Sequence, residues 1–95
     1  MKKCLKITVT GTVTGVGYRE YVKKHARSLE IEGTAQNSDD DQRVVIYARG
    51  DADNLEKFLD HLYKGTPKSK VEDVLAEPFT NERDFRGVFR VIGKD

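Results

Sequence analysis

Residues 5–20 of the chain are LKITVTGTVTGVGYRE, and the rest of the sequence is interpreted outward from this stretch. Apolar and polar residues alternate over residues 5–10, which predicts a strand with one buried face. Three glycines stand within the next seven positions, which predicts a loop. From Tyr18 onward the apolar residues return every three or four positions, so we expect a helix to begin there.

The same periodicities place the later elements. Gly33 is interpreted as the stop signal of the first helix, and Gly65 as that of the second. Asp53 and Glu56 have the spacing of a capping box at the start of the second helix. In chain order we expect a helix over Tyr18–Glu30, strands over Thr34–Asn37 and Val44–Ala48, a helix over Leu55–Tyr63, and strands over Val71–Phe79 and Phe85–Ile92.

This order of elements predicts an α+β fold. It is β-α-β-β-α-β with an additional C-terminal strand, which fits a ferredoxin-like two-layer α/β sandwich. Both helix-bearing links are long enough for crossovers, and the link between the second and third strands is a hairpin. We therefore expect a mostly antiparallel sheet with two helices on one face, in a single domain over residues 1–95. Such a fold hosts many functions, so the function must come from a site.

Composition excludes several classes of function. The 17 Lys and Arg residues nearly balance the 16 Asp and Glu residues, so there is no basic excess to indicate nucleic-acid or membrane-surface binding. No apolar run reaches the ~20 residues of a membrane span, and the first residues lack the apolar stretch of a secretory signal. Cys4 is the only cysteine, which excludes an internal disulfide. We expect a cytoplasmic protein with no membrane or nucleic-acid partner.

The glycine-rich loop has the chemistry of a phosphate site. Glycines let backbone N–H groups approach an anion, and the start of the following helix adds partial positive charge. Arg19 at that helix start offers paired donors for phosphate oxygens. The alternative is a tight turn beside a solvated Arg19. A nucleotide-triphosphate loop is excluded because Tyr18 and Arg19 follow Gly17, and a dinucleotide fingerprint is excluded because Glu20 replaces its third glycine.

Two motifs together resemble the acylphosphatase family. The first is Gly11-x-Val13-x-Gly15-Val16-Gly17-Tyr18-Arg19, and the second is Gly33-x-Ala35-x-Asn37. Residues 65–74 and 84–91 resemble later parts of the family, so the resemblance covers nearly the whole chain. It implies catalytic roles for Arg19 and Asn37, which are 18 residues apart as in the family. The phosphate-binding residues that it implies are Thr14, Gly15, Val16, Gly17, Tyr18 and Arg19.

The resemblance also implies an activity. Members of the family hydrolyse the carboxyl-phosphate bond of small acyl phosphates to a carboxylate and inorganic phosphate, without a metal or another cofactor. Asn37 would orient the attacking water through either atom of its carboxamide. Inorganic phosphate would be both product and inhibitor, and we expect a monomer. The motifs do not distinguish among acyl phosphates, because all present the same phosphoryl group.

Three positions depart from the family pattern. Thr14 replaces a usual glutamine, and Thr34 replaces a usual aromatic residue. The hairpin after Asn37 contains Asp39-Asp40-Asp41 in place of an expected glycine, which we interpret as a solvated turn rather than a cation site.

Other chemistry-bearing residues have simpler interpretations. His25 and His61 lie on the two expected helices without nearby ligand spacing, so we expect solvated histidines and no metal site. Tyr18 begins the apolar stripe of the first helix, so its side chain is expected in the core.

Two other functions stay open from the sequence alone. A non-catalytic or RNA-binding ferredoxin-like module would share the topology, and Arg86-Gly87-Val88-Phe89 resembles part of an RNA-recognition motif. A domain of a larger carbamoyl-transfer enzyme would require the chain to be a fragment.

Overall fold

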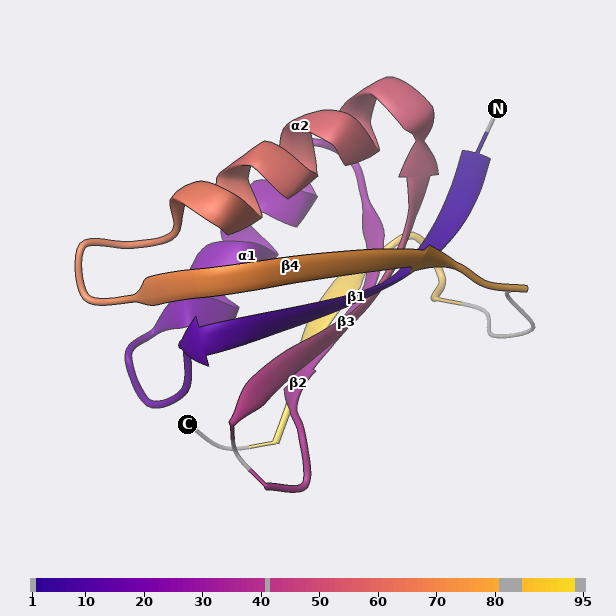
Figure 1. The fold of residues 1–95 in the computed structure, drawn as a ribbon. Coiled ribbons are helices and arrows are strands. Elements are labelled where there is room, and N and C mark those ends of the chain that lie inside the picture. Colours follow the sequence, from indigo (N-terminus) through magenta and orange to yellow (C-terminus); the bar gives the residue numbers. More distant parts are fainter. Residues whose placement is uncertain (1, 41, 81–84, 94–95) are drawn as a thin grey trace.

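The structure, a computed structural model, describes residues 2–40, 42–80 and 85–93. Its elements follow the order expected from the periodicities (Figure 1). They are β1 (Lys2–Thr12), α1 (Tyr18–Ser28), β2 (Glu32–Asn37), β3 (Arg43–Asp51), α2 (Ala52–Lys64), β4 (Lys70–Pro78) and β5 (Phe89–Ile92). The ferredoxin-like α+β fold with an additional C-terminal strand is therefore confirmed.

The five strands form one sheet in the order β4-β1-β3-β2-β5. The first four pair antiparallel, whereas β5 pairs parallel to β2 at one edge. Because β1 and β2 are both antiparallel to β3, the strands β1, β2 and β5 all run in one direction. Their last residues consequently lie at the same end of the sheet, and this end also receives the loop that enters α1.

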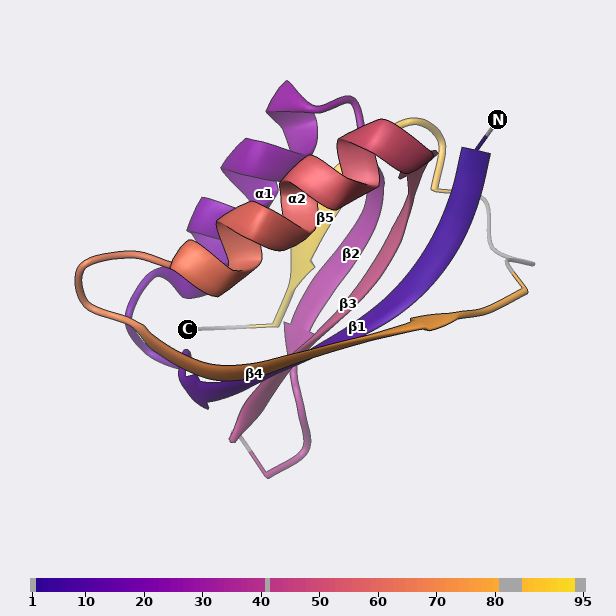
Figure 2. The same cartoon turned by 45° about the horizontal axis from the view of Figure 1, so that its top comes forward.

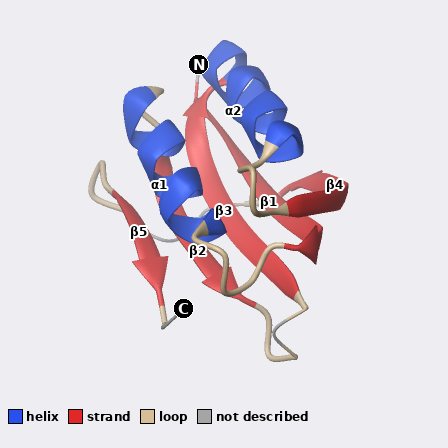
Figure 3. Ribbon diagram, turned by 90° about the vertical axis from the view of Figure 1, so that its left-hand side faces the viewer, coloured by secondary structure: helices blue, strands red, loops and turns tan. Residues whose placement is uncertain are grey.

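Both helices cover one face of the sheet (Figures 1 and 2). Helix α1 packs over β2 and β5, and α2 packs over β3 and β4 (Figure 3). Alternate residues of the strands face the helices and are buried, as a period of two requires. The buried sheet and helix side chains that meet there include Ile7, Val9, Val44, Ile46, Val22, Ala26, Phe58, Leu62 and Phe89.

Tyr18 ties the two helices together inside this core, as its place in the apolar stripe predicted. Its side chain is 1% exposed, and its hydroxyl donates a hydrogen bond to the carbonyl of Leu62 at 2.7 Å. Burial raises the pKa of the Tyr18 hydroxyl far above its ordinary value, so the group stays a neutral donor. Only the backbone of Tyr18 is left to act at the loop.

The end of α1 differs from the expectation. The helix stops at Ser28, and the first residue after it with a positive φ is Glu30, at 56°; Gly33 also has a positive φ, of 148°, but it comes three residues later. Gly33 lies within β2, where a Cβ atom would stand 1.7 Å from the Tyr47 carbonyl oxygen. The glycine is therefore required by the close approach of two strands and not by helix termination.

Two further boundaries were predicted wrongly. Helix α2 begins after Asp51 rather than Asp53, and Asp51 makes no side-chain capping hydrogen bond. The last strand begins only at Phe89, because Arg86 and Gly87 both have positive φ and the N–H of Val88 bonds back to the carbonyl of Phe85 at 3.1 Å. Residues 85–88 thus form a turn.

His25 and His61 are not separate solvated residues, as had been expected. Their rings stack across the two helices with centroids 3.9 Å apart, and the ring of Tyr21 meets His25 edge-on. Burial, the facing His61 and the nearby Lys24 and Lys64 lower the pKa of His25.

This lowered pKa predicts a loss of stability in mild acid. A group whose pKa is lower in the folded state binds fewer protons there than in the unfolded chain. Its contribution to the free energy of unfolding is therefore present above about pH 6.5, the ordinary pKa of histidine, and is lost as the pH falls. Urea unfolding at pH 7.5 and pH 5 should show this loss in the wild type, and a smaller loss in His25→Gln. An equal loss in both proteins would contradict the assignment to His25.

Thr34 gives a second stability prediction. It is 8% exposed, and its hydroxyl oxygen is buried without a hydrogen-bond partner among the described residues. Replacing an unsatisfied buried hydroxyl with a methyl of the same shape removes a desolvation penalty, so Thr34→Val should raise the free energy of unfolding by about 1 kcal/mol. The control Thr12→Val, at an exposed strand position, should stay within about 0.5 kcal/mol of the wild type. A lower free energy of unfolding in Thr34→Val would contradict the interpretation that the Thr34 hydroxyl is unsatisfied.

Candidate functional site

The loop between β1 and α1 has the backbone conformation that its glycines suggested. Gly15 and Gly17 have φ values of 68° and 75°, and both are exposed with open space around them. They are therefore required by conformation rather than by crowding. Left-handed residues at alternate positions are typical of a concave backbone nest for anions. Gly17 is also the N-cap of α1, whose first N–H groups lack partners within the helix.

Arg19 is nearly fully buried, which excludes the alternative of a solvated helix residue. Its side chain lies in the first turn of α1 and is 2% exposed. Its Nη1 donates a hydrogen bond to the carbonyl oxygen of Ile92, the last residue of β5, at 2.6 Å. A buried charge needs such partners to offset the loss of hydration. The guanidinium is thus held at one place beside the loop.

Asn37 ends β2 on the helix-covered face of the sheet. It pairs with Val44, which pairs in turn with Val9, and both valines point into the core. Side chains of directly paired residues share a face, so the carboxamide lies on the side of α1. Its Oδ1 is buried and accepts no hydrogen bond within the part of the chain that the structure describes.

The direction of the strands brings these groups to one corner. The loop follows the end of β1, Asn37 is the end of β2, and the carbonyl that holds Arg19 is the end of β5. Ile92 pairs with Gln36, the residue before Asn37. The remaining loop residues line the entry to α1: Thr14 and Val16 are half-buried and Val16 packs against the core.

The aspartates after Asn37 form a turn, as expected for Asp39 and Asp40; Asp41 lies outside the described residues. The Oδ1 atom of Asp40 accepts hydrogen bonds from the Ser38 hydroxyl at 2.5 Å and the Gln42 N–H at 3.1 Å. The first of these bonds contributes most to a lowered pKa of Asp40. Within the described residues, no three or more His, Cys, Asp or Glu side chains group as a metal site.

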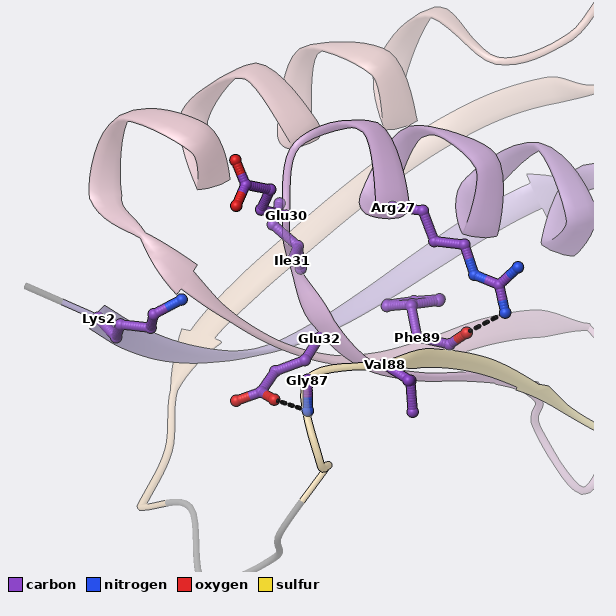
Figure 4. A pocket seen from close by; sticks show the side chains of 8 residues that line it. All are labelled: Lys2, Arg27, Glu30, Ile31, Glu32, Gly87, Val88 and Phe89. Carbon is purple, nitrogen blue, oxygen red and sulfur yellow. Dashed lines mark hydrogen bonds between the residues drawn. The ribbon is translucent and has the colours of Figure 1, made fainter.

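A cavity of about 500 Å³ lies at the opposite end of α1 (Figure 4). Its charged groups already hold the chain together. Glu32 accepts hydrogen bonds from the N–H of Gly87 and from Arg49, and Arg27 donates to the carbonyl of Phe89 at 3.2 Å. None of the catalytic or phosphate-binding residues predicted from the sequence lines this cavity, which we interpret as structural.

A second cavity, of about 440 Å³, reaches the predicted corner. Arg19 lines it together with residues that sequence analysis did not single out, namely Glu20, Lys23, Arg27, Arg90, Val91 and Gly93. The available signal was the spacing of Arg19, Lys23 and Arg27, which are four residues apart along one side of α1. The sequence analysis assigned no role to Lys23 or Arg27.

These features define a class, the two-layer ferredoxin-like α+β proteins with a glycine-rich strand-to-helix loop beside a buried arginine. Comparison with known proteins identifies one family within this class. The acylphosphatase family model matches residues 5–91. An acylphosphatase of Thermotoga maritima is 42% identical over 80 residues, covering 84% of this chain and 88% of the relative.

Solved structures agree with this match. The crystal structure of acylphosphatase from Bacillus subtilis has a TM-score of 0.87 and 32% identity, over 98% of this chain and all of its own. An acylphosphatase structure from Coxiella burnetii also has a TM-score of 0.87 and 32% identity, over 96% of this chain and 93% of that one. The chain therefore belongs to the acylphosphatase family, which confirms the enzyme class that the two motifs indicated. No helix among the described residues has the length and apolar character to cross a membrane.

Proposed function

We propose that this enzyme hydrolyses the carboxyl-phosphate bond of small acyl phosphates, giving a carboxylate and inorganic phosphate. The observation that carries the proposal is the buried Arg19 guanidinium, fixed by the Ile92 carbonyl at the start of α1 beside the glycine-rich loop. Such a cation next to unpaired helix N–H groups favours an anion with several oxygens.

The phosphoryl group would be bound by the backbone and by one side chain. The N–H groups of residues 14–19 and the Arg19 guanidinium would hold its oxygens. Because the Arg19 side chain is already ordered by Ile92, little conformational entropy is lost when the phosphate binds. Tyr18 contributes only its N–H, since its hydroxyl is committed to Leu62.

The chemistry requires mainly positioning and charge stabilisation, because the carboxylate of an acyl phosphate is a good leaving group. The water oxygen attacks phosphorus, the bond from phosphorus to the acyl oxygen breaks, and its electron pair leaves with the carboxylate. A proton of the water passes to a phosphate oxygen. Asn37 would orient this water through Oδ1, the buried oxygen that has no acceptor role within the described residues.

The proposal includes metal-independent turnover and inhibition by inorganic phosphate. We also infer that the enzyme works as a monomer in the cytoplasm. A single assay tests the function against the alternatives: benzoyl phosphate hydrolysis in excess EDTA. Turnover supports the hydrolase, whereas inactivity restored by Mg²⁺ would refute metal independence. Inactivity under both conditions, with binding of single-stranded RNA, would favour the non-catalytic module.

Arg19 gives the first prediction on activity. Arg19→Ala should lower kcat/KM by about 10³ or more, the range for losing an arginine that stabilises a transferred phosphoryl group. Arg19→Lys should restore little, because an ammonium cannot reproduce the planar fork. Steady-state kinetics measure both, and Lys24→Ala is the control for loss of an exposed charge on the same helix.

A thermal shift separates binding from folding in these variants. Inorganic phosphate at ten times its Kd should stabilise the wild type by about 1.4 kcal/mol, or about 5–10 °C in Tm. Folded Arg19 variants should show a much smaller shift. Wild-type kinetics in Arg19→Lys would refute the proposed role.

Asn37 gives the second prediction. A group that orients water acts mainly in the transition state, so Asn37→Ala should lower kcat by about 10²–10³ with KM little changed. Asn37→Asp should also lose activity, because a carboxylate at this position repels the phosphate. Gln36→Ala is the matched control, since this carboxamide is exposed on the opposite face of the same strand. If Asn37→Ala keeps most of its kcat, another group orients the water, and residues 38–40 are the first place to search.

A further inference from the structure

The backbone carbonyl of Ile92, which accepts a hydrogen bond from Arg19, also points toward β2. Strands β5 and β2 run parallel and side by side (Figure 3), with Ile92 paired to Gln36. Just before β5, the carbonyl of Val88 accepts a hydrogen bond from the N–H of Gly33 at 3.0 Å. Peptide groups of a strand point alternately to its two sides, so the carbonyl of Ile92, four residues after Val88, points to β2 as well.

The N–H group that meets this carbonyl is that of Asn37. Asn37 follows Gly33 by four residues, so its N–H points to β5. A residue of a parallel strand bonds to the two residues that flank its partner, and the partner of Ile92 is Gln36. The ladder therefore sets the Asn37 N–H against the Ile92 carbonyl. A carbonyl oxygen has two lone pairs, so it can accept from this N–H and from Arg19 Nη1 together.

The shared acceptor brings the two proposed catalytic residues close together. Arg19 Nη1 lies 2.6 Å from the Ile92 oxygen. With about 3 Å for a backbone hydrogen bond, Nη1 lies no more than about 6 Å from the backbone nitrogen of Asn37. The Asn37 side chain lies on the helix-covered face, where Arg19 is also buried. One phosphoryl group and its attacking water can therefore be served from both residues.

Strand β5 is anchored independently of these two residues. At its other end Phe89 is fully buried, and its ring meets that of Phe58 with centroids 6.1 Å apart. The carbonyl of Phe89 also accepts a hydrogen bond from Arg27 at 3.2 Å. The last carbonyl of the strand is therefore held from the core, and the two catalytic residues are oriented by it.

We propose that the Ile92 carbonyl is a shared positioning group for the reaction. It orients the Arg19 guanidinium for the phosphoryl group, and it fixes the backbone of Asn37, from which the water is held. Ile92 is thus a positioning residue that acts through its main chain, and its side chain is 43% exposed. The inference rests on the proposed hydrolysis of acyl phosphates.

Replacing one amide with an ester tests this proposal without changing the side chains of the site. Glycolic acid in place of Gly93 converts the Ile92 carbonyl to an ester carbonyl, a weaker acceptor, and removes an N–H that points away from β2. The matched control replaces Val91 with its α-hydroxy analogue. This ester weakens the Arg90 carbonyl, which points to β2 in the same way but meets the N–H of Ala35. Each ester is carried in a synthetic C-terminal segment ligated to the rest of the chain, and the reference is the all-amide protein made in the same way.

The two esters should differ in activity and not in stability. Both weaken one bond of the same ladder, so urea unfolding should show similar losses. The Gly93 ester should lower kcat/KM for benzoyl phosphate by about 5- to 30-fold, the range for weakening a hydrogen bond to a charged group, whereas the Val91 ester should stay within about twofold of the reference. Because the carbonyl acts on a binding and a water-orienting residue, both KM and kcat should change.

A mutant cycle separates positioning from a general weakening of the strand. If the carbonyl acts through Arg19 and Asn37, the Gly93 ester should cause a smaller loss in Arg19→Ala, and a smaller loss in Asn37→Ala, than in the otherwise wild-type protein. A strand that had only been weakened would lower kcat/KM by the same factor in all three backgrounds, and this result would overturn the proposal.

The outcomes also separate this inference from the function on which it rests. If the all-amide protein hydrolyses benzoyl phosphate but the Gly93 ester leaves kcat/KM unchanged, or both esters lower it equally, the positioning proposal is overturned and the hydrolase stands. If the all-amide protein does not hydrolyse benzoyl phosphate, the proposed function fails and the inference fails with it.

Discussion

The hydrogen bond from Arg19 Nη1 to the Ile92 carbonyl is the interaction on which the candidate site depends. It joins the first turn of α1 to the last residue of β5, 73 positions away in the sequence. A guanidinium that is 2% exposed would be costly without such partners. The bond therefore serves two ends, because it compensates for a buried charge and fixes the direction of the remaining donors beside the glycine-rich loop.

A second arginine makes a parallel link at the other end of α1. Arg27 donates to the carbonyl of Phe89, so the short strand β5 is attached to the helix at both of its ends. Phe89 also inserts its ring into the core against Phe58. Around Arg27 the neighbouring Glu32 is engaged by Arg49 and Gly87. The strand direction thus separates one end of the molecule, where polar groups hold the chain together, from the other, where they face the proposed anion site.

Local chemistry made the loop, both helices and the order of the elements along the chain predictable. The apolar periods of two and 3.6 residues and the spacing of the glycines depend only on neighbouring residues, and the folded structure agrees with them. The errors arose where tertiary contacts decide. Gly33 looked like a helix stop, but the approach of the Tyr47 carbonyl explains it. Residues 85–88 looked like strand, but Arg86 and Gly87 turn the chain before β5. No sequence pattern predicts which carbonyl holds Arg19, or that His25 and His61 stack across two helices.

The two buried oxygens without partners on β2 show how location decides the meaning of an unsatisfied group. Thr34 Oγ1 and Asn37 Oδ1 both lack a hydrogen bond within the described chain, and each such group costs stability. Thr34 pairs with Tyr47 and with Arg90 on the face without helices, away from the loop that enters α1. Asn37 lies three residues further on, on the opposite face, at the end of the sheet where the loop and Arg19 meet. The same unpaired state is therefore a cost in stability at Thr34, whereas at Asn37 it leaves an acceptor where the proposed mechanism requires a reacting water to be held. Function is inferred from the convergence of groups at one corner, and a single unpaired atom would not have carried that inference.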